Sequence, residues 1–163
     1  MSSTDSTPIP DVGELLAPVL ARVAREQRPL LLAIAERLAA KRYRGWAADP
    51  ANAAHASALH ACADREEEIA RRIEALHADA AVLQDAILAA NPDLEDVNRA
   101  IFAGRPLAQQ FAIQARGERL GVATWRAFAR TEEDATRRAA ILACADLEEE
   151  SARALEAVLA AEG

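Results

Sequence analysis

The 163-residue chain is predicted to be all-α and to form an antiparallel four-helix bundle built from two tandem helical hairpins. Three observations predict this fold class. The composition is rich in alanine and poor in strand-forming residues, apolar residues recur at alternating spacings of three and four, and one half of the sequence repeats the other. Because 52% of the residues are apolar, a single domain of this length can bury a sufficient core.

The internal repeat has one offset, 82 residues, in two separate motifs. The segment Glu36–Leu38 returns as Glu118–Leu120, and Ala61–Glu68 returns as Ala143–Glu150 with one substitution. A single offset indicates that a whole helical hairpin was duplicated, so each residue of one hairpin has a counterpart related by an approximate twofold axis.

Proline and capping residues divide the chain into helices. Pro29 and Pro106 each start or kink the first long helix of a repeat. Asp49-Pro50 and Asn91-Pro92 have the form of an N-cap followed by proline, and Thr131-Glu132-Glu133-Asp134 resembles a capping box. Helices are therefore predicted, in order, over 11–27, 30–47, 50–90, 92–103, 106–130 and 132–162.

These elements are expected to form one domain spanning 11–163, after a Ser/Thr/Pro-rich segment, 1–10, that is predicted to be a disordered tail. Repeat 1 covers about 11–90 and repeat 2 about 92–163. Short links inside each repeat give antiparallel hairpins, while the short helix between the repeats serves as a crossover that returns the second hairpin beside the first.

The charge of the chain excludes some partners. The formal net charge is −7 and the isoelectric point is about 5.0. Nucleic-acid binding needs a basic stripe and is not expected here. The longest apolar run, residues 29–35, is far shorter than the roughly 18 residues that span a bilayer. With no recognisable signal peptide, we expect a cytoplasmic protein that does not enter a membrane.

Four glutamates interrupt apolar helix faces at repeat-related positions. On the second and fourth long helices, Glu66 and Glu148 occupy positions that an apolar residue would otherwise hold in the three-and-four spacing. Glu118 interrupts the apolar face of the third long helix in the same way. Glu36 rests mainly on its repeat partner, because two apolar faces compete on its helix. All four glutamates are predicted to converge in the core.

Four carboxylates in a core need compensation, because burying each charge costs several kcal/mol. Two divalent cations would neutralise them, and an all-oxygen site suits hard ions such as manganese, magnesium or calcium. Iron remains a candidate. Two alternatives stay open. In the first, Glu66 and Glu148 are partly solvated surface residues within their acidic runs; in the second, the core is metal-free and its carboxylates share protons or pair with Arg37 and Arg119.

The residues that accompany the glutamates carry a resemblance to a known family. They are Arg42, Tyr43, Trp46 and Ala47 after Glu36, Phe128 and Ala129 after Glu118, and the segment Ala63–Ile73. Over most of residues 30–160 this pattern resembles the rubrerythrin branch of the ferritin-like superfamily. The resemblance implies a ferritin-like bundle whose four glutamates bind two divalent cations, iron or manganese. It also implies iron or peroxide handling by a metal-dependent oxidoreductase.

Two departures from the family pattern bear on activity. Ile69 and Ser151 occupy the positions of the family's two histidine ligands, so the site would be carboxylate-only. No Cys-x-x-Cys pair is present, so redox activity would need an external electron donor. The family resemblance also favours a homo-oligomer, with a dimer expected. The alternative function is a degenerate, metal-free bundle that acts as an interaction or assembly module.

Four further residues are expected around the site. Tyr43 and Trp125 share inward faces with the first-helix glutamates of their repeats. Cys62 and Cys144 each precede an inward glutamate by one helical turn, and are expected near the site and near each other. Both cysteines are interpreted as small buried hydrophobes, with a thiolate ligand or a redox disulfide as the alternative.

Overall fold

The computed structural model describes residues 8–163, and most of the predicted tail, residues 1–7, lies outside this range. The described part forms seven α-helices and two short 3₁₀ helices without any strand, which confirms the all-α prediction. The helices are α1 (Val12–Ala21), η1 (Arg25–Gln27), α2 (Arg28–Ala48), η2 (Pro50–His55), α3 (Ala56–Glu74), α4 (Ala80–Ala90), α5 (Leu94–Phe102), α6 (Leu107–Thr131) and α7 (Ala135–Glu162). Between residues 8 and 163, no helix combines the length and the apolar character required to traverse a bilayer.

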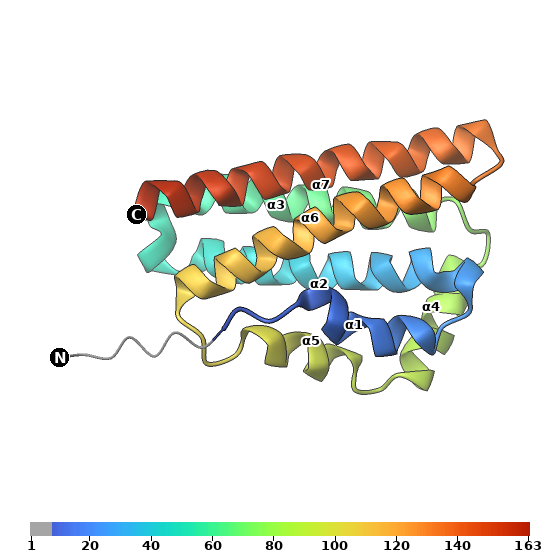
Figure 1. The fold of residues 1–163 in the computed structure, drawn as a ribbon, viewed down its shortest axis with the longest axis horizontal. Helices are drawn as coiled ribbons and strands as arrows, with labels where there is room; N and C mark the ends of the chain where they lie inside the picture. The colour runs from blue at the N-terminus through green and yellow to red at the C-terminus, as the bar shows by residue number, and fades with distance from the viewer. Residues whose placement is uncertain (1–7) are drawn as a thin grey trace.

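The four longest helices, α2, α3, α6 and α7, lie lengthwise beside one another (Figure 1). Helix α2 packs on α3, α6 packs on α7, and α3 packs on α7. Within each hairpin the two helices run in opposite directions (Figure 1). Helices α4 and α5 carry the chain back along the length of the molecule, so that α6 begins at the end where α3 begins (Figure 1). Helix α1 packs against α6.

The repeat predicted from the sequence is visible in matching ion pairs. Arg37 donates through Nε and Nη2 to the two carboxylate oxygens of Glu74, at 3.0 and 2.6 Å. Arg119 makes the same forked contact with Glu156, at 2.9 and 2.8 Å. Each partner lies 82 residues from its counterpart. The hairpins α2–α3 and α6–α7 are therefore built alike.

The segment 50–90 is not the single helix that was predicted. It divides into η2, α3 and α4, with a turn over residues 75–79. The Arg137 guanidinium of α7 donates to the carbonyl oxygen of Leu76, and the His77 ring contacts the carbonyl oxygen of Ile73 at 3.0 Å. Side chains thus satisfy backbone acceptors that would otherwise need the next turn of helix. Helix α3 ends here, and α4 turns aside to pack on α2.

One of the three predicted N-caps is confirmed. The Asp49 side chain accepts from the backbone N–H two residues later, at 2.9 Å, and caps η2. Asn91 instead ends α4, because its amide donates to the carbonyl oxygen one turn earlier at 2.9 Å. Thr131 is the last residue of α6, and Asp134 caps α7. Helices α5 and α7 therefore begin two and three residues later than predicted, respectively.

Candidate metal centre

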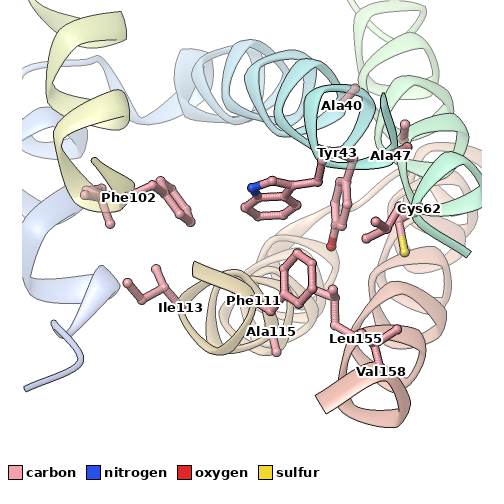
Figure 2. Packing of buried hydrophobic residues seen from close by; sticks show 14 residues of the cluster. Ala40, Tyr43, Ala47, Cys62, Phe102, Phe111, Ile113, Ala115, Leu155 and Val158 are labelled. Atoms are coloured by element: carbon pink, nitrogen blue, oxygen red, sulfur yellow. The ribbon is translucent and has the colours of Figure 1, made fainter. Parts of the chain in front are cut away.

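Each of the four long helices carries its glutamate between two apolar clusters. The first cluster, drawn in Figure 2, includes Tyr43, Leu59, Phe111 and Leu155. The second includes Ala33, Ile69, Trp125 and Ile141. Along every long helix the glutamate falls between a residue of one cluster and a residue of the other. Glu36, Glu66, Glu118 and Glu148 therefore form one polar level that divides the core.

Three of these four carboxylates meet closely. Glu36, Glu66 and Glu148 each place one carboxylate oxygen within 4.8 Å of the others. Glu66 and Glu148 are 0% and 1% exposed, whereas Glu36 is partly exposed. The alternative that Glu66 and Glu148 are partly solvated surface residues is therefore wrong, because each acidic run turns one glutamate inward.

Glu118, the fourth predicted carboxylate, is 2% exposed and held by two donors. The Tyr43 hydroxyl donates to its Oε1 at 2.6 Å, and the Gln114 amide donates to the same oxygen at 2.7 Å. Glu118 also hydrogen-bonds to Glu148. It therefore lies at one side of the group of three, and Tyr43 of the first repeat fixes a carboxylate of the second.

Two neighbours on α6 position the Glu148 carboxylate. The Trp125 indole N–H donates to its Oε1 at 2.9 Å, so Trp125 contacts the site as predicted. Gly121 leaves room for the same group, because a Cβ there would lie 2.4 Å from Glu148 Oε1 and 2.6 Å from its Cδ. Any larger residue at 121 would require the carboxylate to move.

The two carboxylate oxygens of Glu66 have different environments. The Ser151 hydroxyl donates to its Oε1 at 2.9 Å, and Arg65 donates through Nε to the Ser151 oxygen at 3.0 Å. Its other oxygen, Oε2, is buried and has no hydrogen-bond donor. Residue 151 is one of the two positions where the resembling family has histidine. Here it contributes a hydroxyl that orients Glu66.

The other such position, Ile69, offers no ligand atom and is fully buried in the second cluster. Helices α3 and α7 are antiparallel, and Glu66 of α3 faces Ser151 of α7. A residue that follows Glu66 therefore faces a residue that precedes Ser151 by the same number of positions. This register places Ile69 opposite Glu148. The donor set is accordingly all oxygen.

Burial controls the protonation of the cluster. It raises the pKa of the Glu36 carboxyl from 4.5 to about 7. It also holds the pKa values of Glu66 and Glu148 well above 4.5, and the negative charges of the neighbouring carboxylates add to both shifts. Compared with an exposed carboxyl, both Glu66 and Glu148 are therefore shifted toward the protonated form.

Arg37 and Arg119 do not neutralise the cluster. Both guanidinium groups bind glutamates outside the cluster, as described above, so the alternative in which they pair with the buried carboxylates is wrong. Adjacent helical residues point about 100° apart, so an arginine that follows an inward glutamate faces away from the core. The arginines closer to the cluster are Arg65 and Arg42, whose Nε donates to Gln114 Oε1 at 3.0 Å.

The two cysteines do not lie together. Cys62 and Cys144 are free and buried, but they belong to different apolar clusters. Because α3 and α7 run in opposite directions, the residue one turn before each glutamate lies on opposite sides of the polar level. The predicted proximity is therefore wrong, and the disulfide alternative fails with it. Burial also raises the pKa of both thiols, that of Cys144 to about 12, which disfavours a thiolate ligand.

No known protein family, curated protein or solved structure matches the chain. Conclusions about function therefore rest on the geometry of the polar level. Sequence reasoning missed Arg65, Gln114 and Gly121, which contact or make room for the site. Only Gly121 left a signal, since a glycine inside a helix pattern often indicates close packing.

Proposed function

We propose that the polar level is a divalent-cation site in a ferritin-like bundle. The observation that carries the proposal is the buried, unpaired Oε2 of Glu66, which lies in a group whose three carboxylates approach within 4.8 Å. A buried acceptor without a donor costs free energy. A cation bound between Glu36, Glu66 and Glu148 would satisfy that oxygen and replace the protons that the cluster otherwise holds.

The donor set suits hard ions. Carboxylate oxygens without nitrogen ligands favour manganese, magnesium or calcium, with water completing the coordination, over copper or zinc. The three close carboxylates would supply ligands for a first cation, and Glu118 together with Glu148 would supply oxygen ligands for a second. Tyr43 and Trp125 would hold Glu118 and Glu148 in orientation in the bound state, as they do here.

The helix order and directions support the ferritin-like arrangement. Two duplicated hairpins joined by a crossover along the molecule, with one glutamate on each long helix, are what the sequence resemblance implies. On this basis we propose a role in iron or peroxide handling. The cation would supply redox or Lewis-acid chemistry, and an external donor would supply electrons. The chain contributes the carboxylates, their orientation and a dry environment.

A second function is favoured by one observation: donors already satisfy part of the cluster without any cation. Tyr43, Gln114, Trp125 and Ser151 each donate to a buried carboxylate. In this alternative the site is a relic that keeps its protons, and the protein acts through its surface as an interaction or assembly module. Metal content separates the two functions.

The test is elemental analysis of protein purified from cells supplied with iron and manganese. We expect about one or more ions per chain, and almost none in a Glu66→Gln/Glu148→Gln variant, because the two buried ligands are lost. A metal-free parent protein, or a variant with the same metal content as the parent, would contradict a cation site among these residues.

A Gly121→Ala variant should weaken cation binding at least about tenfold, because the new Cβ displaces the Glu148 carboxylate. The free energy of unfolding without cation should change little, since the preference of alanine over glycine in a helix, about 1 kcal/mol, offsets the cost of moving the carboxylate. Titration calorimetry with Mn²⁺ measures the affinity. Gly117→Ala is the control one turn earlier, where a Cβ meets nothing within 4 Å. Equal affinities in the two variants would contradict the proposed ligand role of Glu148.

A further inference from the structure

A cavity of about 230 Å³ leads from the surface to the carboxylates. Its walls come from α1, α2, α5 and α6, and Glu36, Glu118 and Glu148 lie along it. Leu120, which is 37% exposed, also lines the cavity, so the cavity reaches the surface of α6. This side of the polar level differs from the α3–α7 side, where Ser151 and Arg65 occupy the space next to Glu66.

Small residues keep the cavity open. Ala35 and Ala39 on α2 line it together with Gly117 and Gly121 on α6, and these two pairs are repeat partners at the offset of 82. The space beside Gly117 is large enough that a Cβ there would touch nothing within 4 Å. An apolar cavity of about 150 Å³ is enough to bind benzene, so this one can hold a short alkyl chain or a ring.

The walls and the inner end differ in chemistry. The walls are mostly apolar, with Leu16, Leu20, Leu32, Ile101, Phe102 and Ile113 among them. At the inner end, the hydrogen-bond donors beside the carboxylates are engaged by the protein. Gln114 and Trp125 donate to carboxylates, Thr124 donates to a backbone carbonyl, and Arg42 donates to Gln114 and Asn98.

The groups left over at the inner end are therefore acceptors. In Glu118 and in Glu148, only Oε1 accepts a hydrogen bond from a tyrosine, glutamine or tryptophan side chain. Among the described residues, the side-chain hydrogen bonds of Glu36 are with the neighbouring carboxyl groups. A ligand with hydrogen-bond donors at one end and an apolar chain at the other fits this arrangement. A carboxylate head group would bring only further acceptors.

We propose that the cavity binds a primary alkylammonium ligand, with its NH₃⁺ group at Glu36, Glu118 and Glu148 and its alkyl chain between α1, α2, α5 and α6. The ammonium group has three donors and no acceptor, which matches the carboxylate oxygens. The chain of the ligand replaces water along the apolar walls. This site goes beyond the proposed cation function and does not require a bound metal.

The test is titration calorimetry of the EDTA-treated full-length protein at pH 7 with n-hexylammonium, n-butylammonium and hexanoate. We expect saturable binding of n-hexylammonium, about tenfold or more weaker binding of n-butylammonium because two buried methylenes are lost, and no binding of hexanoate. Absence of saturable n-hexylammonium binding, or equal binding of hexanoate, would overturn the proposal. These comparisons use the unaltered chain.

Two leucine variants locate the site. Gly117→Leu should fill the cavity and lower n-hexylammonium affinity at least about tenfold, because the ligand and the new side chain compete for one volume. Gly45→Leu, on an exposed position of α2 where a Cβ also meets nothing, should bind as the parent does. Unchanged affinity in a folded Gly117→Leu protein would overturn the proposal. Mn²⁺ binding is measured separately on the same proteins, so failure of the cation site and failure of the amine site give different results.

Discussion

Replacing Glu66 and Glu148 together by glutamine is expected to stabilise the cation-free protein at pH 8 by at least about 3 kcal/mol, which corresponds to a pKa raised by one unit in each of the two groups. The parent protein must either ionise these buried groups or keep them protonated at a pH where the unfolded chain has lost the protons. Each pH unit above the pKa of the unfolded chain, up to the pKa in the folded protein, costs about 1.4 kcal/mol per group. Glutamine keeps the geometry. Its oxygen can accept from Ser151 or Trp125, and its amide can donate where the protonated carboxyl does now.

The direction of the pH dependence follows from raised pKa values. Folding keeps protons on Glu36, Glu66 and Glu148 that the unfolded chain releases above about pH 4.5. Their contribution to stability is complete below that pH and is lost as the pH rises through the raised pKa values, that of Glu36 being about 7. Partly exposed carboxyls such as Glu67 and Glu149 have lowered pKa values, so their contribution to stability is lost as the pH falls below about 4.5.

Urea unfolding in EDTA from pH 5 to pH 8 measures this effect. The parent should lose stability steadily across the range, and the glutamine variant should lose much less. Glu67→Gln/Glu149→Gln is the matched control, since each changed residue directly follows a buried glutamate and pairs with a surface arginine. A parent curve that is flat from pH 5 to pH 8, or a control that behaves like the buried variant, would contradict the assigned protonation.

The positions of the glutamates could be predicted because the signal is local. Glu66 and Glu148 interrupt an apolar stripe whose helical period the structure keeps, and both are buried. Glu36 was assigned only through its repeat partner, and the structure places it within the group of three as a partly exposed residue. A duplicated sequence thus supplies a prediction where the local pattern is ambiguous.

Which glutamate each partner contacts could not be predicted, because this depends on the register between helices far apart in sequence. Tyr43 reaches Glu118 across 75 residues, and Ser151 reaches Glu66 across 85. The antiparallel course of α3 and α7 decides these pairs, and it also separates the two cysteines. No periodicity within a single helix contains that information.

The break between α3 and α4 was missed for a related reason. Residues 75–79 contain neither glycine nor proline, so the local sequence favours a continuous helix. The chain turns there in part because Arg137, 61 residues away, donates to the Leu76 carbonyl oxygen. A long-range contact thus overrides local propensity.

Uptake of Mn²⁺ by the EDTA-treated protein at pH 6 is expected to release more than about one proton per ion, because ligands must be deprotonated to bind a metal. Glu36 has a pKa of about 7, and the pKa values of Glu66 and Glu148 are raised well above 4.5, so this cluster retains protons to a higher pH than exposed carboxyls do. Exposed carboxylates are already ionised and would release almost none. Proton release therefore distinguishes the buried cluster from the acidic surface.

Calorimetric titration with Mn²⁺ in two buffers of different ionisation enthalpy counts these protons and tests the central claim directly. The cation site predicts saturable binding with proton release in the parent and in the Glu67→Gln/Glu149→Gln control, and no such binding in Glu66→Gln/Glu148→Gln. Mn²⁺ binding without proton release, or no binding by the parent, would contradict a cation site at Glu36, Glu66 and Glu148.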